Sequence, residues 1–265
     1  MPITSGPART GSSRVRMTAR TLRRDRWWLQ PVLTEFGLLA FVAYSAWVAF
    51  QNAGYYVEPY VSPFYSPCVS DSCPSGAQTF HAAFAVPAGL SPALIVLIFP
   101  LGFRVSCYYY RKAYYRSFWL APPACAVAEP HKRYTGETRF PLILQNVHRY
   151  FFLAGVLFAA ILTYDAVLAF DFGGHAGMGL GTLVLVVNAI LIWGYTLGCH
   201  SCRHIIGGRL RAFSRHPVRY RFWSWVSVLN GRHMQWAWAS LIWVALTDVY
   251  IRLVASGVIT DVRFF

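Results

Sequence analysis

Five long runs of apolar residues alternate with polar and charged segments along the chain. They cover residues 36–50, 83–103, 150–170, 177–197 and 236–254. About 20 apolar residues in helical conformation cross the hydrocarbon core of a bilayer, and residues 27–51 extend the first run to that length. A soluble protein of 265 residues does not need five such runs. The pattern therefore predicts an all-α fold, an integral membrane bundle of five transmembrane helices.

The chain divides into a short tail and one membrane domain. Residues 1–26 are rich in Arg, Ser and Thr and contain few apolar residues, which predicts a disordered basic cytoplasmic tail. The tail has no apolar core with a cleavage site, as a removed signal peptide would. Residues 27–265 form the predicted five-helix transmembrane anchor domain, with its second helix over 83–110 and a strongly basic loop over 209–232.

The charge distribution predicts the orientation in the membrane. The chain has a formal net charge of +14, and 22 of its 24 basic residues fall in 1–31, 104–149 and 203–232. These segments alternate with the basic-free loops 51–82 and 171–177. This is the positive-inside pattern, which places the N-terminus in the cytoplasm and the C-terminus outside a multi-pass inner (plasma) membrane protein. Binding to nucleic acid is not expected, because it would need basic residues along one soluble face.

Polar residues on the outer side and inside the spans have structural explanations. Cys68 and Cys73 lie on the first outer loop, where an oxidising compartment favours a disulfide between them. Asp165 and Asp248 fall inside predicted spans, so they are expected to face the bundle or water. Asp248 is four residues from Arg252, a spacing that permits an ion pair on one helix face.

Thiols and imidazoles gather at the predicted inner ends of the helices. The densest stretch is Cys199-His200-Ser201-Cys202-Arg203-His204, at the end of the fourth apolar run. On a regular helix its thiol pair and its imidazole pair point in different directions, so one helix cannot enclose a small cofactor with all four groups. Other segments must then supply ligands, and Cys125 and His148 are the candidates by topology.

Three metal centres fit such residues. Two Cys and two His match a Rieske-type [2Fe–2S] centre, in which two His replace two Cys on one iron. The same residue types bind zinc tetrahedrally. Two histidines on adjacent helices can also bind one haem axially. The structural alternative is that the cysteines are small buried apolar residues and the histidines are interfacial.

Two segments resemble a known family. They are CYYYRKAYYRSFWLAPPACAVAEPHKRYTGETRFPLILQNVHRYFF and GCHSCRHIIGGRLRAFSRHPVRYRFWSWVSVLNGRHMQWAWASL. Both resemble the membrane-anchor (cytochrome b-like) subunit of actinobacterial respiratory complex II, succinate dehydrogenase, and the likeness extends over about residues 60–265. It implies an anchor, inactive alone, that is bound on its cytoplasmic face by a flavoprotein subunit and an iron–sulfur subunit. The complex would pass electrons from succinate to a membrane quinone, menaquinone.

The resemblance also implies the kind of redox centre. This subclass is understood to lack haem and to carry a membrane-embedded Rieske-type [2Fe–2S] cluster. A two-haem arrangement needs axial histidines at both depths, and the outer side offers only His81 and His175, both near loops. The implied ligands are one thiol and one imidazole from each of two segments. The candidate metal ligands are Cys125, His148, Cys199, Cys202, His200 and His204, with the choice within each pair of the second segment left open.

A quinone site needs an apolar slot with a few placed polar groups. His233, at the start of the fifth helix, is the favoured hydrogen-bond donor to a quinone head, and it is also a possible ligand. Trp236 and Arg203 are further candidates for quinone binding.

Three other functions remain open at this stage. A haem b-containing anchor of the same complex would keep the role and change the cofactor. A thiol–quinone oxidoreductase would use Cys199 and Cys202 as an exchanging dithiol. A transporter or scaffold would use the same residues to hold structural zinc.

Overall fold

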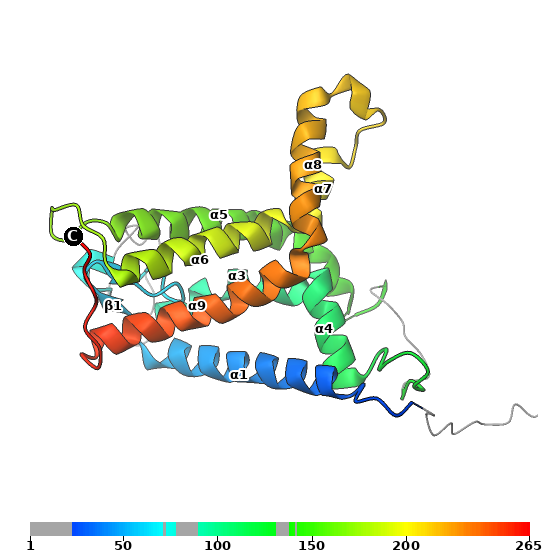
Figure 1. Ribbon diagram of the computed structural model, residues 1–265, viewed down its shortest axis with the longest axis horizontal. Coiled ribbons are helices and arrows are strands. Elements are labelled where there is room, and N and C mark those ends of the chain that lie inside the picture. Colours follow the sequence, from blue (N-terminus) through cyan, green and yellow to red (C-terminus); the bar gives the residue numbers. More distant parts are fainter. Residues whose placement is uncertain (1–22, 71–72, 78–89, 131–137, 141) are drawn as a thin grey trace, which may run out of the picture.

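The computed structural model is an elongated bundle of helices (Figure 1). It describes residues 23–70, 73–77, 90–130, 138–140 and 142–265. The α-helices are α1 (Leu29–Gln51), α2 (Pro92–Val96), α3 (Ile98–Ser106), α4 (Tyr108–Trp119), α5 (His148–Leu168), α6 (Leu180–Leu197), α7 (His200–Gly207), α8 (Pro217–Gly231) and α9 (His233–Ala255). Short elements are β1 (Tyr56–Val57), β2 (Tyr60–Val61) and the 3₁₀ turns η1 (Ser75–Ala77), η3 (Leu142–Val147) and η4 (Phe213–Arg215).

Four helices are long and apolar enough to cross a membrane, namely α1, η3 with α5, α6 and α9. A fifth crossing is possible if α2–α3 and α4 count as one span, but this pair bends by 75°. The all-α membrane bundle is therefore confirmed, with four or five spans in the described part of the chain. The predicted second helix over 83–110 is not regular, because it breaks at Cys107, and residues 83–89 lie outside the described ranges. Residues 1–22 of the predicted tail also lie outside them.

Successive spans run in opposite directions, so the bundle has two chemically different ends (Figure 1). We call the end with α4, α7, α8 and the first residues of α5 and α9 the basic end. The opposite end carries β1, β2 and the C-terminus, and we call it the disulfide end. In the middle, α6 packs against α5 and α9, and α3 packs against α5. Close approach needs small residues here: a Cβ at Gly155 would lie 2.8 Å from the Phe103 ring.

The first loop folds into the disulfide end of the bundle. Tyr60, Tyr65 and Cys68 are at most 1% exposed, and the backbone around them packs beneath the helix ends. The predicted disulfide between Cys68 and Cys73 is present.

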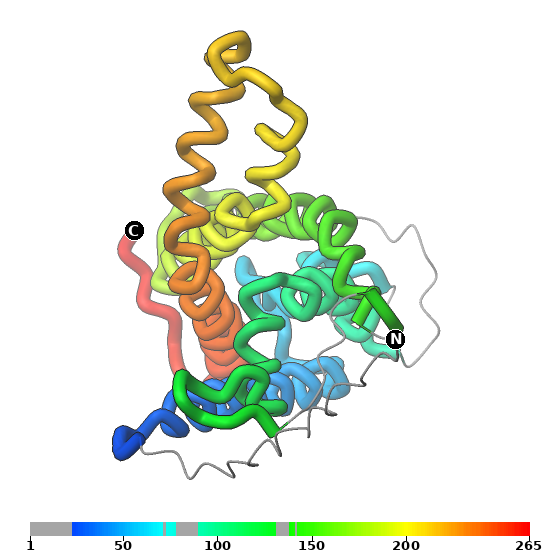
Figure 2. The backbone as a smooth tube through the Cα atoms, turned by 90° about the vertical axis from the view of Figure 1, so that its right-hand side faces the viewer, coloured from blue at the N-terminus to red at the C-terminus, as the bar shows by residue number. Residues whose placement is uncertain are grey.

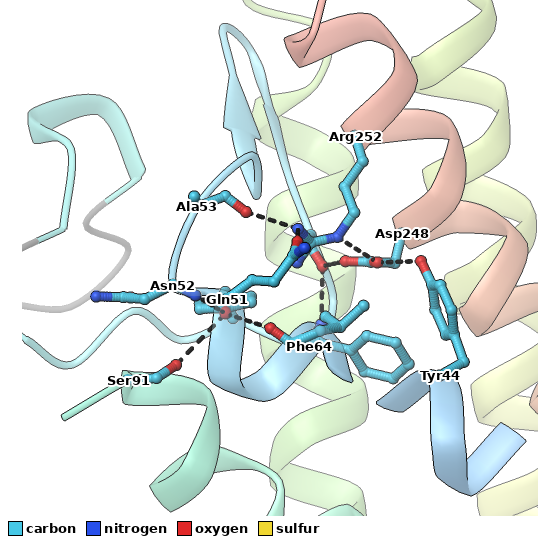
Figure 3. A network of polar contacts seen from close by, with 11 residues as sticks. Tyr44, Gln51, Asn52, Ala53, Phe64, Ser91, Asp248 and Arg252 are labelled. Carbon is cyan, nitrogen blue, oxygen red and sulfur yellow. Dashed lines mark hydrogen bonds and ion pairs between the residues drawn. The ribbon is translucent and has the colours of Figure 1, made fainter. Parts of the chain in front are cut away.

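Both intramembrane carboxylates are bound by this loop. Asp248 of α9 accepts hydrogen bonds from Tyr44 (2.5 Å) and from Ser62, and it forms an ion pair with Arg252 at 2.7 Å (Figure 3). The (i, i+4) pair expected from the sequence is thus present. Asp165 is likewise buried and accepts a hydrogen bond from Ser66. The burial of both charges is compensated by partners, as bilayer depth requires.

The basic segment after α6 forms a helical hairpin. The sequence predicted a loop over 209–232, but α8 occupies most of it and packs against α7. The hairpin stands nearly perpendicular to the spans, beside the basic end, and extends beyond the ring of spans (Figures 1 and 2). Trp223 of α8 packs against Gly207 of α7 and Val226 is buried, and this tertiary packing stabilises the helix.

Candidate metal centre

Two thiols and two imidazoles meet at the basic end. The Nε2 atom of His148 lies 3.0 Å from the Sγ atom of Cys199, and Nε2 of His233 lies 3.4 Å from Sγ of Cys107. Both cysteines are buried, and both belong to one apolar cluster. The four residues come from four different segments, so the tertiary fold alone brings them together.

Each of the four residues stands at the start of a helix. Cys107 precedes α4 and Cys199 precedes α7, both with extended backbone (ψ of 131° and 144°). His148 and His233 are the first residues of α5 and α9. Helix N-termini carry a partial positive charge, which favours an anionic group. The arrangement is therefore suited to thiolates and to a negatively charged centre.

A glycine permits the approach of the helix ends. A Cβ at Gly198, the residue before Cys199, would lie 2.7 Å from the carbonyl oxygen of Gly194 and 3.2 Å from that of Leu229. It would also lie 3.4 Å from Nδ1 of His233. The Asn230 amide donates to the Gly198 carbonyl at 2.8 Å. The end of α8 is thereby fixed to the end of α6, which places His233 beside the cysteines.

The tautomer of His148 follows from its neighbour Ser106. The Ser106 hydroxyl lies 2.6 Å from the Gly102 carbonyl, which can only accept, so its proton goes there. Nδ1 of His148 lies 2.9 Å from the same hydroxyl oxygen and must then donate to it. This leaves Nε2, the atom that faces Cys199, with its lone pair free. An imidazole held in this way is prepared to bind a metal.

Aromatic rings enclose both imidazoles. His148 stacks on Phe103 and His233 stacks on Tyr195, each with ring centroids 5.1 Å apart and planes 10° from parallel. Phe103 and Tyr195 themselves lie 5.2 Å apart. Nδ1 of His233 is buried without a hydrogen-bond partner among the described residues. The stacked rings fix both imidazole planes, and both histidines remain partly exposed.

Arg104 supplies positive charge next to this group. Its guanidinium lies 4.7 Å from the centre of the Tyr195 ring, and it donates to the Tyr110 hydroxyl at 2.6 Å. It also donates to Ser240 at 3.2 Å, and Tyr110 donates to the Ala237 carbonyl one turn beyond His233. The cation is therefore held by α4 and α9 and can offset negative charge on the thiolates.

Burial affects the thiols strongly. It raises the pKa of the Cys199 thiol to about 12, with a further contribution from the nearby Cys107, and it also raises the pKa of Cys202. Such thiols are protonated at pH 7 unless a cation stabilises the thiolate. A metal at this position would provide that cation and displace the proton.

Only two of the six candidate ligands are brought together, His148 and Cys199. Cys125 is exposed, and its carbonyl accepts a hydrogen bond from Arg23 at 2.9 Å. Cys202 is buried within α7, one turn beyond Cys199. His200 and His204 are both exposed, and Nδ1 of His204 lies 3.0 Å from Arg149. His200 nevertheless lies within electrostatic range of His148 and His233, without a hydrogen bond to either among the described residues.

Sequence reasoning assigned Cys107 no role and gave His233 mainly to the quinone. The sequence predicted a continuous helix through residue 110, so Cys107 was given no role. The chain turns at Cys107 instead. One signal was available: each of the two histidines begins an apolar run, and each of the two cysteines ends one. His131, also at the predicted inner side, lies outside the described residues.

The donor arrangement distinguishes between metals. No three His, Cys, Asp or Glu side chains of the described ranges are grouped to hold a single ion. The four residues form two Cys–His pairs instead. A structural zinc needs four ligands on one ion, whereas a Rieske-type centre would have both histidines on one iron and both cysteines on the other. Two thiols and two imidazoles are the donor types of such a centre, although the contacts of the four side chains pair each histidine with a cysteine.

The other candidate quinone-binding residues lie apart from an open slot. The Trp236 ring packs against Gly194, and its Nε1 atom is buried without a partner among the residues described. Arg203 lies on α7, with its guanidinium 4.7 Å from the centre of the Trp223 ring of α8. Neither residue lines the apolar grooves near the thiols and imidazoles that the structure describes.

A groove does open between α1, α3, α4 and α9. Its volume is about 330 Å³, and its lining residues are apolar except for Arg104, Tyr110 and Tyr114. Leu38 of α1 and Trp119 of α4 both line it. A smaller cavity of about 120 Å³ lies deeper in the bundle and shares Arg104 and Leu101 with it. The groove thus leads from the outside of the bundle to the cation beside the thiols.

Comparison with known proteins assigns the family. The sequence model described as actinobacterial succinate dehydrogenase subunit SdhC matches residues 29–257, which is most of the chain. The chain belongs to this family. A chain of a solved structure described as the Mycobacterium smegmatis Sdh1 complex in the apo form is 56% identical to it. The match covers 96% of this chain and 98% of that one, with a TM-score of 0.89. No curated protein sequence matches.

Family membership settles the broad role. This SdhC-family chain is the membrane-anchor subunit of a succinate dehydrogenase complex, and it acts together with the other subunits of that enzyme. Its apolar helices make it a multi-pass protein of the inner membrane. The transporter and scaffold alternatives are thereby excluded as its main function.

Proposed function

We propose that this anchor holds a Rieske-type [2Fe–2S] centre and connects a partner iron–sulfur subunit to menaquinone. The supporting observation is the meeting of Cys107, His148, Cys199 and His233 at four helix starts. When bound, such a centre exchanges one electron at a time, at a potential raised by its histidine ligands. The two cysteines and the two histidines would hold it.

The protein residues around the centre have defined tasks. Ser106 fixes the tautomer of His148, and Phe103 and Tyr195 fix the planes of the two imidazoles. Arg104 balances the charge of the thiolates. These groups are set before any cofactor arrives, so little reorganisation accompanies a change of charge at the site.

The basic end is the side on which we place the cytoplasm and the partner subunits. The helix starts with the four donors, α4 and the hairpin all lie there, together with the arginines of those segments (Figure 1). The positive-inside rule assigns this side to the cytoplasm and the C-terminus to the outside. Electrons from the flavoprotein and iron–sulfur subunits would therefore enter next to the proposed centre.

The first prediction concerns the ligands. Replacement of His148 or His233 by Ala should abolish quinone reduction by the purified complex, because each removes one donor from an iron. Oxidation of succinate with a soluble artificial acceptor should continue. Electron paramagnetic resonance of the reduced complex should lose the signal of a histidine-ligated [2Fe–2S] centre in both variants.

His204→Ala and Cys125→Ser are the matched controls, since both residues are exposed and outside the donor group. They should keep the resonance signal and the quinone activity. A b-type haem absorption band, or zinc without iron and acid-labile sulfide, would contradict the proposal. Retention of the signal in His233→Ala would show that Cys107 and His233 are not ligands.

We further propose that menaquinone enters by the groove between α1 and α4. The groove is apolar, as an isoprenoid quinone requires, and Arg104 provides one polar group at its inner end. The guanidinium can donate to a quinone oxygen. His233, the residue favoured from the sequence, would act instead as a ligand next to that site.

The second prediction tests the groove. Leu38→Trp replaces a leucine of the groove wall by a larger, aromatic side chain that should obstruct the groove. We expect the KM for menaquinone to rise about tenfold, which corresponds to a loss of about 1.4 kcal/mol in binding free energy. Activity with a soluble acceptor should be unchanged. Leu33→Trp is the control, because Leu33 is a 60% exposed residue of the same helix and does not line the groove. Equal effects of both variants would exclude this entrance.

A further inference from the structure

The hairpin of α7 and α8 presents two chemically different surfaces. We propose that it lies in the headgroup layer of the membrane and binds anionic phospholipids, with the apolar side of α8 in the acyl region and its arginines at the phosphates. This assignment is separate from electron transfer and from the proposed metal centre. It rests on the shape, exposure and charge of the hairpin.

One face of α8 is already used in packing. Trp223 covers Gly207 of α7 so closely that a Cβ there would lie 2.4 Å from the ring. Arg219 donates to the Ile206 carbonyl at 2.9 Å, and Val226 is buried. These three residues turn the same side of α8 toward α7. The hairpin is therefore a packed unit with a defined free side.

The free side of α8 is apolar. Val218, Phe222 and Trp225 are 67%, 51% and 60% exposed. At about 100° per residue they fall within about 60° of the helix circumference, and the nearest edge of this stripe is about 40° from the face that meets α7. A stripe of this kind, with Trp and Phe in it, is typical of helices that lie in the membrane interface.

Arginines surround the stripe without any acidic residue. Residues 203–232 contain seven arginines and no Asp or Glu. Arg211, Arg215 and Arg221 are all exposed, and the Arg221 guanidinium lies 5.7 Å from the centre of the Trp225 ring. A cluster of this size next to a span attracts anionic lipid, each basic residue adding to the attraction near the surface.

The position of the hairpin favours lipid over a soluble protein as its partner. α8 stands perpendicular to the spans at the level where α5 and α9 begin, so it runs parallel to the membrane plane (Figure 1). Seen along the bundle, the hairpin lies outside the ring of spans (Figure 2). The hairpin thus lies beside the bundle, at the level of the helix starts, where a surrounding bilayer would have its interface.

The test uses the whole complex, purified in detergent and titrated with cardiolipin or phosphatidylcholine under native mass spectrometry. We expect preferential retention of cardiolipin, and a loss of about fivefold in its affinity for each arginine removed in Arg215→Gln and Arg221→Gln. Phosphatidylcholine binding should not change. Arg263→Gln, an exposed arginine at the disulfide end, is the matched control and should leave cardiolipin binding intact.

Hydrogen exchange gives a second readout that does not depend on these variants. In nanodiscs, the amides of α8 should exchange more slowly when anionic lipid is present than in phosphatidylcholine alone. Equal retention of both lipids by the unmodified complex, or equal exchange in both nanodiscs, would overturn the proposal. Release of the soluble subunits by Arg215→Gln and Arg221→Gln with lipid preference unchanged would assign the hairpin to a protein partner instead.

Discussion

At the scale of single residues, Ser106 shows how a neutral side chain can fix the tautomer of a histidine. Its one proton is taken by the Gly102 carbonyl, so its oxygen must accept from Nδ1 of His148. Without it, the imidazole would be free to place its proton on the atom that faces Cys199. Hydrogen bonds of this kind to metal-binding histidines affect affinity or activity by about 10- to 100-fold.

Ser106→Ala is therefore expected to lower quinone reduction about tenfold while the subunits stay assembled. Its signature is a changed midpoint potential and a shifted resonance spectrum, which a purely structural role would not produce. Ser117→Ala is the control, since Ser117 on α4 also donates to the carbonyl four residues earlier, Ala113. Identical spectra for Ser106→Ala and the unmodified complex would exclude the positioning role.

At the scale of the elements, the lengths of the apolar runs predicted the long helices well. α1, α5, α6 and α9 each coincide with one of these runs. The run lengths did not predict the breaks. The apolar run before Cys107 and the run before Cys199 continue into residues that can also be helical, so nothing in their composition requires a turn. The turns arise from tertiary packing, and they position both thiols.

The turn before Cys199 depends on the absence of a Cβ atom at Gly198. Gly198→Ala would put a methyl group against the carbonyls of Gly194 and Leu229 and should destabilise the complex by about 1–3 kcal/mol. The resonance signal should weaken, because His233 is displaced with the end of α8. Gly231→Ala, at a position with open space around it, should change neither the melting temperature nor the spectrum.

The sequence predicted which types of residue form the candidate site, but not which individual residues. Residue types and the end of the bundle followed from the sequence, and His148 and Cys199 were among the candidates. Cys125 was favoured because it follows two prolines in the right segment, yet that segment ends at the surface beside Arg23. The contact of Cys107 with His233 joins residues 126 positions apart, which local pattern cannot reveal.

At the scale of the whole molecule, the two ends are built differently. The basic end contains the helix starts that bring two cysteines and two histidines together. The disulfide end is closed by the first loop, by the Cys68–Cys73 bond and by the polar network around Asp248 (Figure 3). Tyr44, Ser62 and Arg252 bring three segments to that one carboxylate.

Asp248→Asn should consequently destabilise the bundle by about 3–5 kcal/mol, because it leaves the Arg252 guanidinium in a buried site without its charge partner. The melting temperature of the detergent-solubilised complex measures this. Asp25→Asn, which removes the partner of Arg23 in an exposed ion pair, should change it little. A similar loss in both variants would show that burial of the Asp248 pair is not the cause.

The buried first loop also bears on energy conservation. Among the described residues, Tyr65 and Phe64 are buried at the disulfide end, and Phe64 lines the mostly apolar cavity of about 120 Å³, whose polar lining includes Ser45, Thr196 and Arg104. If the quinone binds next to Arg104 as proposed, we expect its protons to come from the compartment that supplies the electrons. Turnover would then move no net charge across the bilayer, and the membrane potential would neither drive the reaction nor be generated by it.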